Sequence, residues 1–75
     1  MKTIIINKSI LEEDLPFAIA CILNEDCDSN IDFCAETNGN IIEYDVTEKE
    51  DPIYWTISEI HYNEDYSVKS VDIDC

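Results

Sequence analysis

The sequence predicts an α+β fold in which one helix packs on one face of an antiparallel sheet, in the order β-α-β-β-β-β. Residues 2–7 are rich in β-branched side chains, as strands are. A single apolar segment with the start signals of a helix follows. From residue 30 onward, apolar and polar residues alternate with the period of half-buried antiparallel strands. A chain of 75 residues without linker or repeat is expected to form one domain over residues 1–75.

The helix is expected at about residues 14–24. Asp14 stands where an N-cap is favoured, and Pro16 is tolerated only in the first turn of a helix. The run 17–23 is apolar nearly all round, so we expect a well-buried helix. Within that run the thiol of Cys21 should act as a small hydrophobic group.

Four strands are expected after the helix. Asn38-Gly39 between the first two is a strong hairpin signal. The alternation breaks at Lys69-Ser70, which predicts a bulge in the last strand. The expected strands are residues 30–37, 40–47, 53–62 and 66–74.

Alternation also assigns side chains to the two faces of the sheet. Glu43 and Asp45 are expected on the face opposite the helix. In the following strand, His61 is expected to share a face with Ile57, at an exposed or rim position, while Ile60 points the other way.

The charge balance excludes several classes of function. The chain has 18 acidic residues against four Lys, no Arg and a net charge of −14. Without a cationic face it is not expected to bind nucleic acid itself, and an anionic membrane would repel it. The longest apolar run, residues 17–23, is too short to span a bilayer. The run 4–6, which Asn7 and Lys8 end, is too short for the core of a signal peptide. We therefore expect a cytoplasmic protein.

The four cysteines are expected to be free thiols, because a reducing compartment disfavours disulfides. A disulfide and a metal site are the alternatives. No metal or other cofactor is expected. The run 26–32 resembles the start of a calcium loop, but Ile31 and Thr37 occupy the positions that need Gly and Glu. A small one-helix domain also offers little room for a catalytic cleft, so we expect no enzymatic activity.

The acidic residues suggest a function through their spacing. Carboxylates at i, i+2 on a strand lie about 6.6–6.8 Å apart, and adjacent strands lie roughly 4.8 Å apart. We expect an ordered anionic array on the face opposite the helix, with further acids at the turns. It could stand in for phosphates in a protein groove lined by Arg and Lys, with tyrosines as anchors. A merely solvated acidic face is the alternative. The expected partner-binding residues are Asp32, Glu36, Glu43, Asp45, Glu48, Glu50, Asp51, Glu59, Glu64, Asp65, Asp72, Asp74, Tyr44 and Tyr62.

In size, charge, lack of Arg and mixture of acids with aromatics, the chain resembles the small acidic inhibitors encoded by bacteriophages. This class includes uracil-DNA glycosylase inhibitors and DNA-mimic anti-restriction and anti-CRISPR proteins. The resemblance is one of composition over the whole chain, and no motif residues carry over. It implies a phage protein that blocks the basic nucleic-acid-binding groove of a host defence or DNA-processing protein, for example a CRISPR effector or a restriction enzyme.

Two other functions fit the same electrostatics. An immunity protein or antitoxin would plug the active site of one basic toxin nuclease. An acidic adaptor would bind a basic peptide along a sheet edge. The exposed edges of a small sheet and the many aromatics also leave a homodimer possible.

Overall fold

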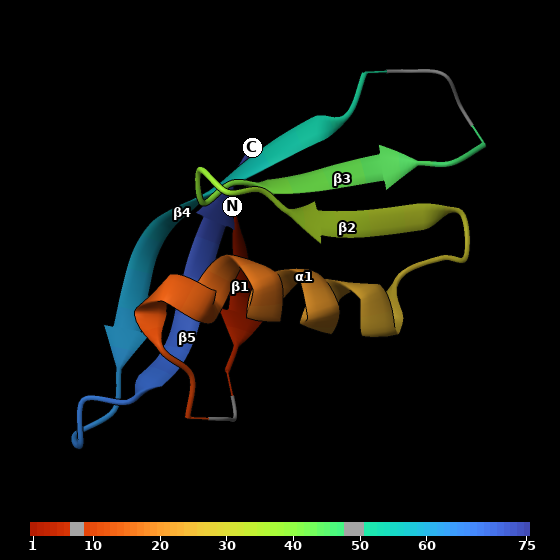
Figure 1. The fold of residues 1–75 in the computed structure, drawn as a ribbon. Coiled ribbons are helices and arrows are strands. Elements are labelled where there is room, and N and C mark those ends of the chain that lie inside the picture. The colour runs from red at the N-terminus through yellow and green to blue at the C-terminus, as the bar shows by residue number, and fades with distance from the viewer. Residues whose placement is uncertain (7–8, 48–50) are drawn as a thin grey trace.

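The predicted α+β class is confirmed by a computed structural model, which describes residues 1–6, 9–47 and 51–75. One α-helix and a five-stranded antiparallel sheet, in the order β1-β5-β4-β3-β2, form the described part of the chain. The helix follows β1, as expected (Figure 1). The elements are β1 Lys2–Ile5, the 3₁₀ turn η1 Glu12–Asp14, α1 Leu15–Asp26, β2 Ile31–Ala35, β3 Ile41–Asp45, β4 Ile53–Tyr62 and β5 Val68–Asp74.

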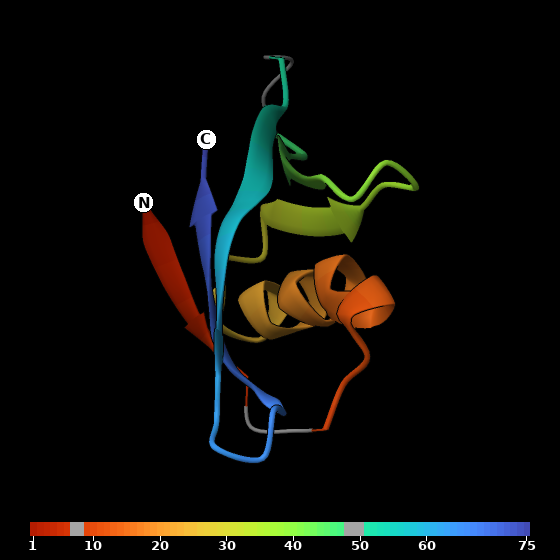
Figure 2. The same ribbon diagram turned by 90° about the vertical axis from the view of Figure 1, so that its left-hand side faces the viewer.

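Strand β4 joins two halves of one curled sheet. Its first part, residues 53–55, pairs with β3, and its second part, residues 56–62, pairs with β5. Figures 1 and 2 show β4 bending between these halves, so that the sheet wraps around α1. The helix therefore lies on the concave side of the sheet, and the opposite face is convex. We call this convex side the outer face.

The core lies between α1 and the concave side of the sheet. Five side chains in it are inaccessible to solvent: Leu15 and Ile19 of α1, Ile41 of β3, and Val71 and Ile73 of β5. Full burial of each such aliphatic side chain contributes about 1.5–3 kcal/mol to folding. The helix and both halves of the sheet thus contribute side chains to one apolar cluster.

Only one side of α1 is buried, so the expectation of a well-buried helix was wrong. Phe17 is 68% exposed, and Cys21 is exposed rather than a core hydrophobe. The reason is that a single helix on a single sheet has no second layer to cover its far side. Asp14 occupies the N-cap position without a side-chain capping bond. None of the described helices is long and apolar enough to cross a membrane.

The hairpin turn at Asn38-Gly39 and the bulge in the last strand, both predicted from the sequence, are confirmed. The β2–β3 turn has Gly39 at φ +91°, a conformation that favours glycine, and its N–H donates to the Glu36 carbonyl over 3.1 Å. In β5, Ser70 lies opposite His61 and Val68 opposite Tyr62, which leaves Lys69 as an extra residue. This is the bulge that the break in alternation indicated.

A second bulge, at Ser58 in β4, was not predicted. Ile57 lies opposite Ile73 of β5, whereas Glu59 lies opposite Asp72, so Ser58 has no partner residue on β5. An extra residue in one strand reverses the inward and outward alternation beyond it. The face assignments after Ser58 are therefore the opposite of those expected from strict alternation.

This reversal corrects the positions of four residues in β4. Ile60 packs against the core, as Ile57 does, although the two were expected on opposite faces. Tyr62, two residues after Ile60, also lies on the concave side. His61 lies with Glu59 on the outer face rather than on the side of Ile57. The physical reason is the gain from keeping apolar Ile60 in the core.

Strand β3 is also turned the other way from the expectation. Glu43 lies opposite Phe33 of β2, which is buried against the helix, and Asp45 lies opposite Ile31. Both acids are therefore on the concave side and not opposite the helix. Two adjacent isoleucines made the alternation ambiguous. The structure places Ile41 in the apolar cluster under the helix, whereas Ile42 is buried, at 7% exposure, on the other face of the sheet.

The carboxylate of Glu43 is accommodated on this side by a partner. Trp55, packed against the core from β4, donates its Nε1–H to Glu43 Oε1 over 3.1 Å. A carboxylate beside a core is tolerated when such hydrogen bonds replace those to water.

The orientation of β3 can be tested with two variants. Replacement of Ile41 by Ala should lower the free energy of unfolding by about 2–5 kcal/mol, because it opens a cavity in the core. Replacement of Ile42 by Ala should cost less, because Ile42, although only 7% exposed, lies outside the cluster that joins the helix to the sheet. Urea denaturation of both variants measures the difference. An equal or larger loss for Ile42→Ala would contradict the observed orientation.

Candidate functional site

Four predicted partner-binding carboxylates lie on the outer face, and we call them the outer acidic group. Glu59 of β4 is opposite Asp72 of β5, and Asp74 follows two residues later on the same strand. Asp32 is on the same face of the far strand, β2, opposite Tyr44. The group therefore extends over both halves of the curled sheet, with three of its members at the β4–β5 pair.

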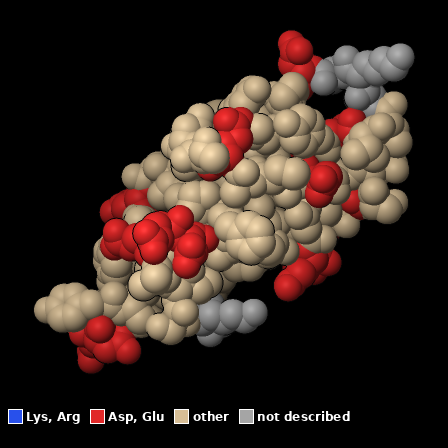
Figure 3. Space-filling view, in the orientation of Figure 1, with Lys and Arg blue, Asp and Glu red and all other residues tan. Residues whose placement is uncertain are grey.

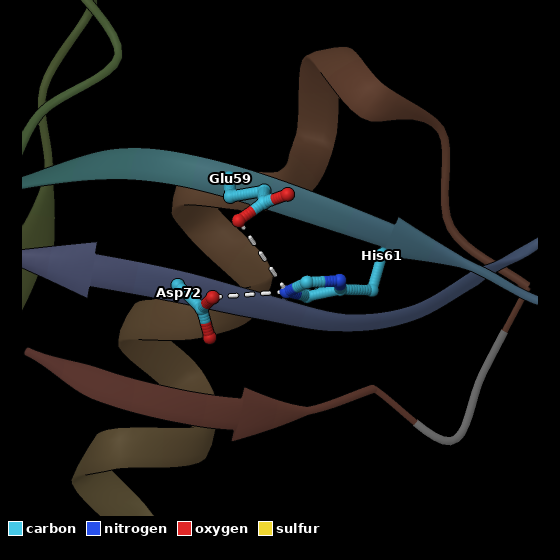
Figure 4. A group of neighbouring side chains, drawn as sticks. All are labelled: Glu59, His61 and Asp72. Carbon is cyan, nitrogen blue, oxygen red and sulfur yellow. Dashed lines mark hydrogen bonds and ion pairs between the residues drawn. The ribbon is translucent and has the colours of Figure 1, made fainter.

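His61 lies beside two of these carboxylates, those of Glu59 and Asp72 (Figure 4). Its Nε2 is 2.9 Å from Asp72 Oδ2 and 4.0 Å from Glu59 Oε2. Asp72 is held from the other side by Thr3 of β1, whose Oγ1–H donates to Oδ1 over 2.8 Å. As a result the Asp72 side chain is only 13% exposed, whereas that of His61 is 43% exposed.

These contacts shift two pKa values in opposite directions. The hydrogen bond to Asp72 raises the pKa of His61 above its ordinary value, and the two neighbouring carboxylates add to this effect. The same hydrogen bond lowers the pKa of Asp72, with a further contribution from Thr3. The pair is thus favoured in its charged form, His61⁺ with Asp72⁻.

Tyrosines divide between the two faces of the sheet. Tyr44 and Tyr54 lie on the outer face and are 40% and 52% exposed. Tyr54 lies opposite Ile42, two residues from Tyr44, so the two rings are diagonal neighbours on adjacent strands. Tyr62 does not join them, because its hydroxyl donates to the carboxylate of Glu12 on the helix side, which raises the Tyr62 pKa.

The remaining predicted acids lie elsewhere. Glu43 and Asp45 are on the concave side, where Asp45 Oδ1 accepts a bond from the Thr47 N–H over 2.9 Å. Glu36 belongs to the β2–β3 turn, and Asp51 is exposed before β4. Glu48 and Glu50 lie outside the described residues.

Glu64 and Asp65 belong to the exposed β4–β5 turn. Asp65 Oδ1 accepts a bond from the Ser67 N–H over 3.0 Å and one from its hydroxyl, and these bonds lower the Asp65 pKa. The carboxylate of Asp65 thus remains ionised while it also closes the turn.

The expected single array opposite the helix is therefore corrected. Figure 3 shows acidic atoms in several separate groups across the face that also displays α1 in Figure 1, and no Lys atom is visible among the described residues there. The reversed alternation in β3 puts Glu43 and Asp45 on this side. The outer acidic group is the part of the predicted array that the structure brings together on the opposite face.

The cysteines show no common site. All four are free, and only Cys27 is partly buried. The thiol of Cys34 contacts Asp32 Oδ2 at 3.7 Å, and its pKa is raised mainly by desolvation and further by that carboxylate. Asp26, Asp28 and Asp32 of the calcium-like run do not converge as a group of ligands.

Exposed apolar side chains gather beside the start of α1. Ile5, Leu11 and Phe17 are all largely exposed and line a shallow groove along the helix. Exposed apolar groups of this kind often mark contact surfaces. A homodimer stays a prediction.

The His61–Asp72 pair predicts a pH-dependent contribution to stability. A raised His61 pKa stabilises the fold fully below the ordinary pKa of 6.5, and this contribution is lost as the pH rises through the folded-state value. The lowered Asp72 pKa adds stability above pH 3.8, the ordinary pKa of an aspartate, and this contribution is lost as the pH falls through the folded-state value. The melting temperature of the wild type should therefore exceed that of His61→Gln by more at pH 5.5 than at pH 8.5. Thermal unfolding in metal-free buffer measures this difference, and a difference independent of pH would contradict the pairing.

Comparisons with known proteins find no relative of this chain. No family model, no curated protein and no solved structure matches it. Function must therefore be argued from the residues of this chain and their geometry.

Proposed function

We propose that this protein is a phage-type inhibitor that binds the basic nucleic-acid-binding groove of a host defence or DNA-processing protein, where its carboxylates replace phosphates. The observation that carries the proposal is the net charge of −14, which arises because 18 acidic residues stand against four lysines. Binding by such a protein blocks the groove without any catalytic step.

The distribution of cations supports this proposal. Ion pairs in which both partners are described join the N-terminal amino group to Asp74 and His61 to Glu59 and Asp72. The described lysines, Lys2 and Lys69, take part in none of them. Self-repulsion of like charges opposes folding, so a partner of opposite charge relieves a cost that the free protein bears.

The shape of the outer face also supports it. A convex face fits a concave groove, and Tyr44 and Tyr54 lie on it between Asp32 on one side and Glu59 on the other. Exposed tyrosines are common anchors of interfaces, because they bury a large area at little cost in side-chain entropy. Carboxylates around them favour rapid, salt-dependent association with a basic surface.

In the first step of the test, partners from a nuclease-treated bacterial lysate are captured on the immobilised protein at about 50 mM salt and eluted at about 200 mM salt. Contacts to phosphate-like charges weaken strongly over this range of salt concentration. Each purified partner is then assayed for binding of labelled nucleic acid. We expect the protein to compete with nucleic acid for that site. A partner that keeps its nucleic-acid binding when saturated with the protein would contradict the proposal. A single toxin nuclease as the only inhibited partner would favour the immunity function instead.

The position of the interface predicts which charges matter. Asp32→Lys combined with Glu59→Lys should weaken inhibition about tenfold or more, because two attractions become repulsions of the order of 0.5–1 kcal/mol each. Glu13→Lys combined with Glu25→Lys changes the net charge equally on the helix side and should have a smaller effect. The inhibition constants of both variants at constant salt measure the difference.

Either of two results would contradict this assignment. Equal losses in the two double variants would show that only net charge matters and that the outer face is not the interface. Unchanged inhibition in both would show that the acidic residues do not mediate binding. Thermal unfolding of each variant checks that the fold is retained.

A further inference from the structure

We propose that Glu59, His61 and Asp72 form a binding site for a divalent transition-metal ion of the zinc type on the outer face of the sheet. Within residues 1–6, 9–47 and 51–75, these three side chains are the group whose candidate ligand atoms converge, all within 4.8 Å of one another. Figure 4 shows the three side chains directed toward one another from β4 and β5, with the helix behind the strands.

The backbone positions this group through the bulge at Ser58. Glu59 and His61 are two residues apart after the bulge and point to the same face, and Asp72 lies directly opposite Glu59 on β5. Strict alternation from Ile57 would have placed the imidazole on the side of the core. The ligand set is therefore a product of strand register and not of sequence spacing.

The distances suit a metal after small side-chain rotations. Zinc binds imidazole nitrogen at about 2.0–2.1 Å and carboxylate oxygen at about 2.0–2.2 Å, so tetrahedral ligand atoms lie somewhat more than 3 Å apart. His61 Nε2 is 2.9 Å from Asp72 Oδ2 and 4.0 Å from Glu59 Oε2. Glu59 is well exposed and free to swing toward the imidazole. An ion between the three atoms would take the place of the present His61–Asp72 hydrogen bond.

The ligand types select the metal. One imidazole and two carboxylates suit zinc and similar ions, whereas calcium and magnesium prefer oxygen ligands alone. Three protein ligands leave a fourth position for water or a group from a partner. The two carboxylates balance the charge of a divalent ion, and the anionic protein raises the local concentration of cations.

A second layer of contacts already orients the most buried ligand. The Thr3 hydroxyl donates to Asp72 Oδ1, which leaves Oδ2 directed at His61. Partners of this kind fix ligand orientation in metal sites, and their loss commonly lowers affinity 10–100-fold. The site thus has one preorganised carboxylate, one half-exposed imidazole and one exposed carboxylate.

The experiment uses the fact that the chain has a single histidine. Zinc is titrated into the full protein, with its cysteines alkylated so that thiols cannot compete, and the two ring C–H signals of His61 are followed by NMR. We expect saturable shifts at one equivalent with micromolar zinc, and no such shifts with magnesium. Isothermal titration calorimetry then gives the affinity of the wild type and of the variants.

The variants separate the site from general attraction of cations. His61→Gln removes the imidazole ligand but no carboxylate, and it should lower zinc affinity at least about tenfold, as should Asp72→Asn. Glu25→Gln, which removes one charge at the far end of the helix, should bind zinc as the wild type does. Wild-type affinity in His61→Gln, an equal loss in Glu25→Gln, or unshifted His61 signals at saturating zinc would each overturn the proposal. The titration needs no protein partner, so its outcome is independent of the inhibitory function.

Discussion

The pairing of β4 with β5 is the constraint on which the rest of the structure depends. Strand β4 has ten residues and belongs to both halves of the curled sheet. Its extra residue at Ser58 lets Ile57 and Ile60 both reach the core although they are three positions apart. The same shift turns Glu59 and His61 outward. The packing of Ile60 in the core and the outward positions of Glu59 and His61 thus follow from one irregularity in one strand.

The fold places charge on both sides of a thin molecule. With one helix and one sheet there is a single core layer, and most side chains that do not face it are open to solvent. Such a molecule can carry 18 carboxylates because few of them need to be near one another or near the core. The carboxylate beside the core, Glu43, has a hydrogen-bond donor in Trp55. The outer face differs from the rest by combining acids with two exposed tyrosines and the single histidine.

The two proposals concern the same face but different physical effects. Inhibition depends on long-range attraction between an anionic surface and a basic groove, so it is sensitive to salt and to the sum of many charges. Metal binding depends on three ligand atoms at short range and on the identity of one imidazole. A bound divalent ion would neutralise two charges at the β4–β5 pair and leave most of the negative charge in place.

Much of the fold could be predicted from local patterns. The β-branched start, the helix signals around Asp14 and Pro16, the Asn38-Gly39 turn and the broken alternation at Lys69-Ser70 each act over a few residues, so they determined element order, element type and one bulge. Composition alone determined the strongly anionic character. Tertiary structure decided the faces: Ile41 rather than Ile42 in the cluster under the helix, Glu43 and Asp45 on the helix side of the sheet, and His61 beside Asp72. Strand faces depend on register, and register is chosen by the whole core at once, because a shift of one residue exchanges every inward and outward side chain.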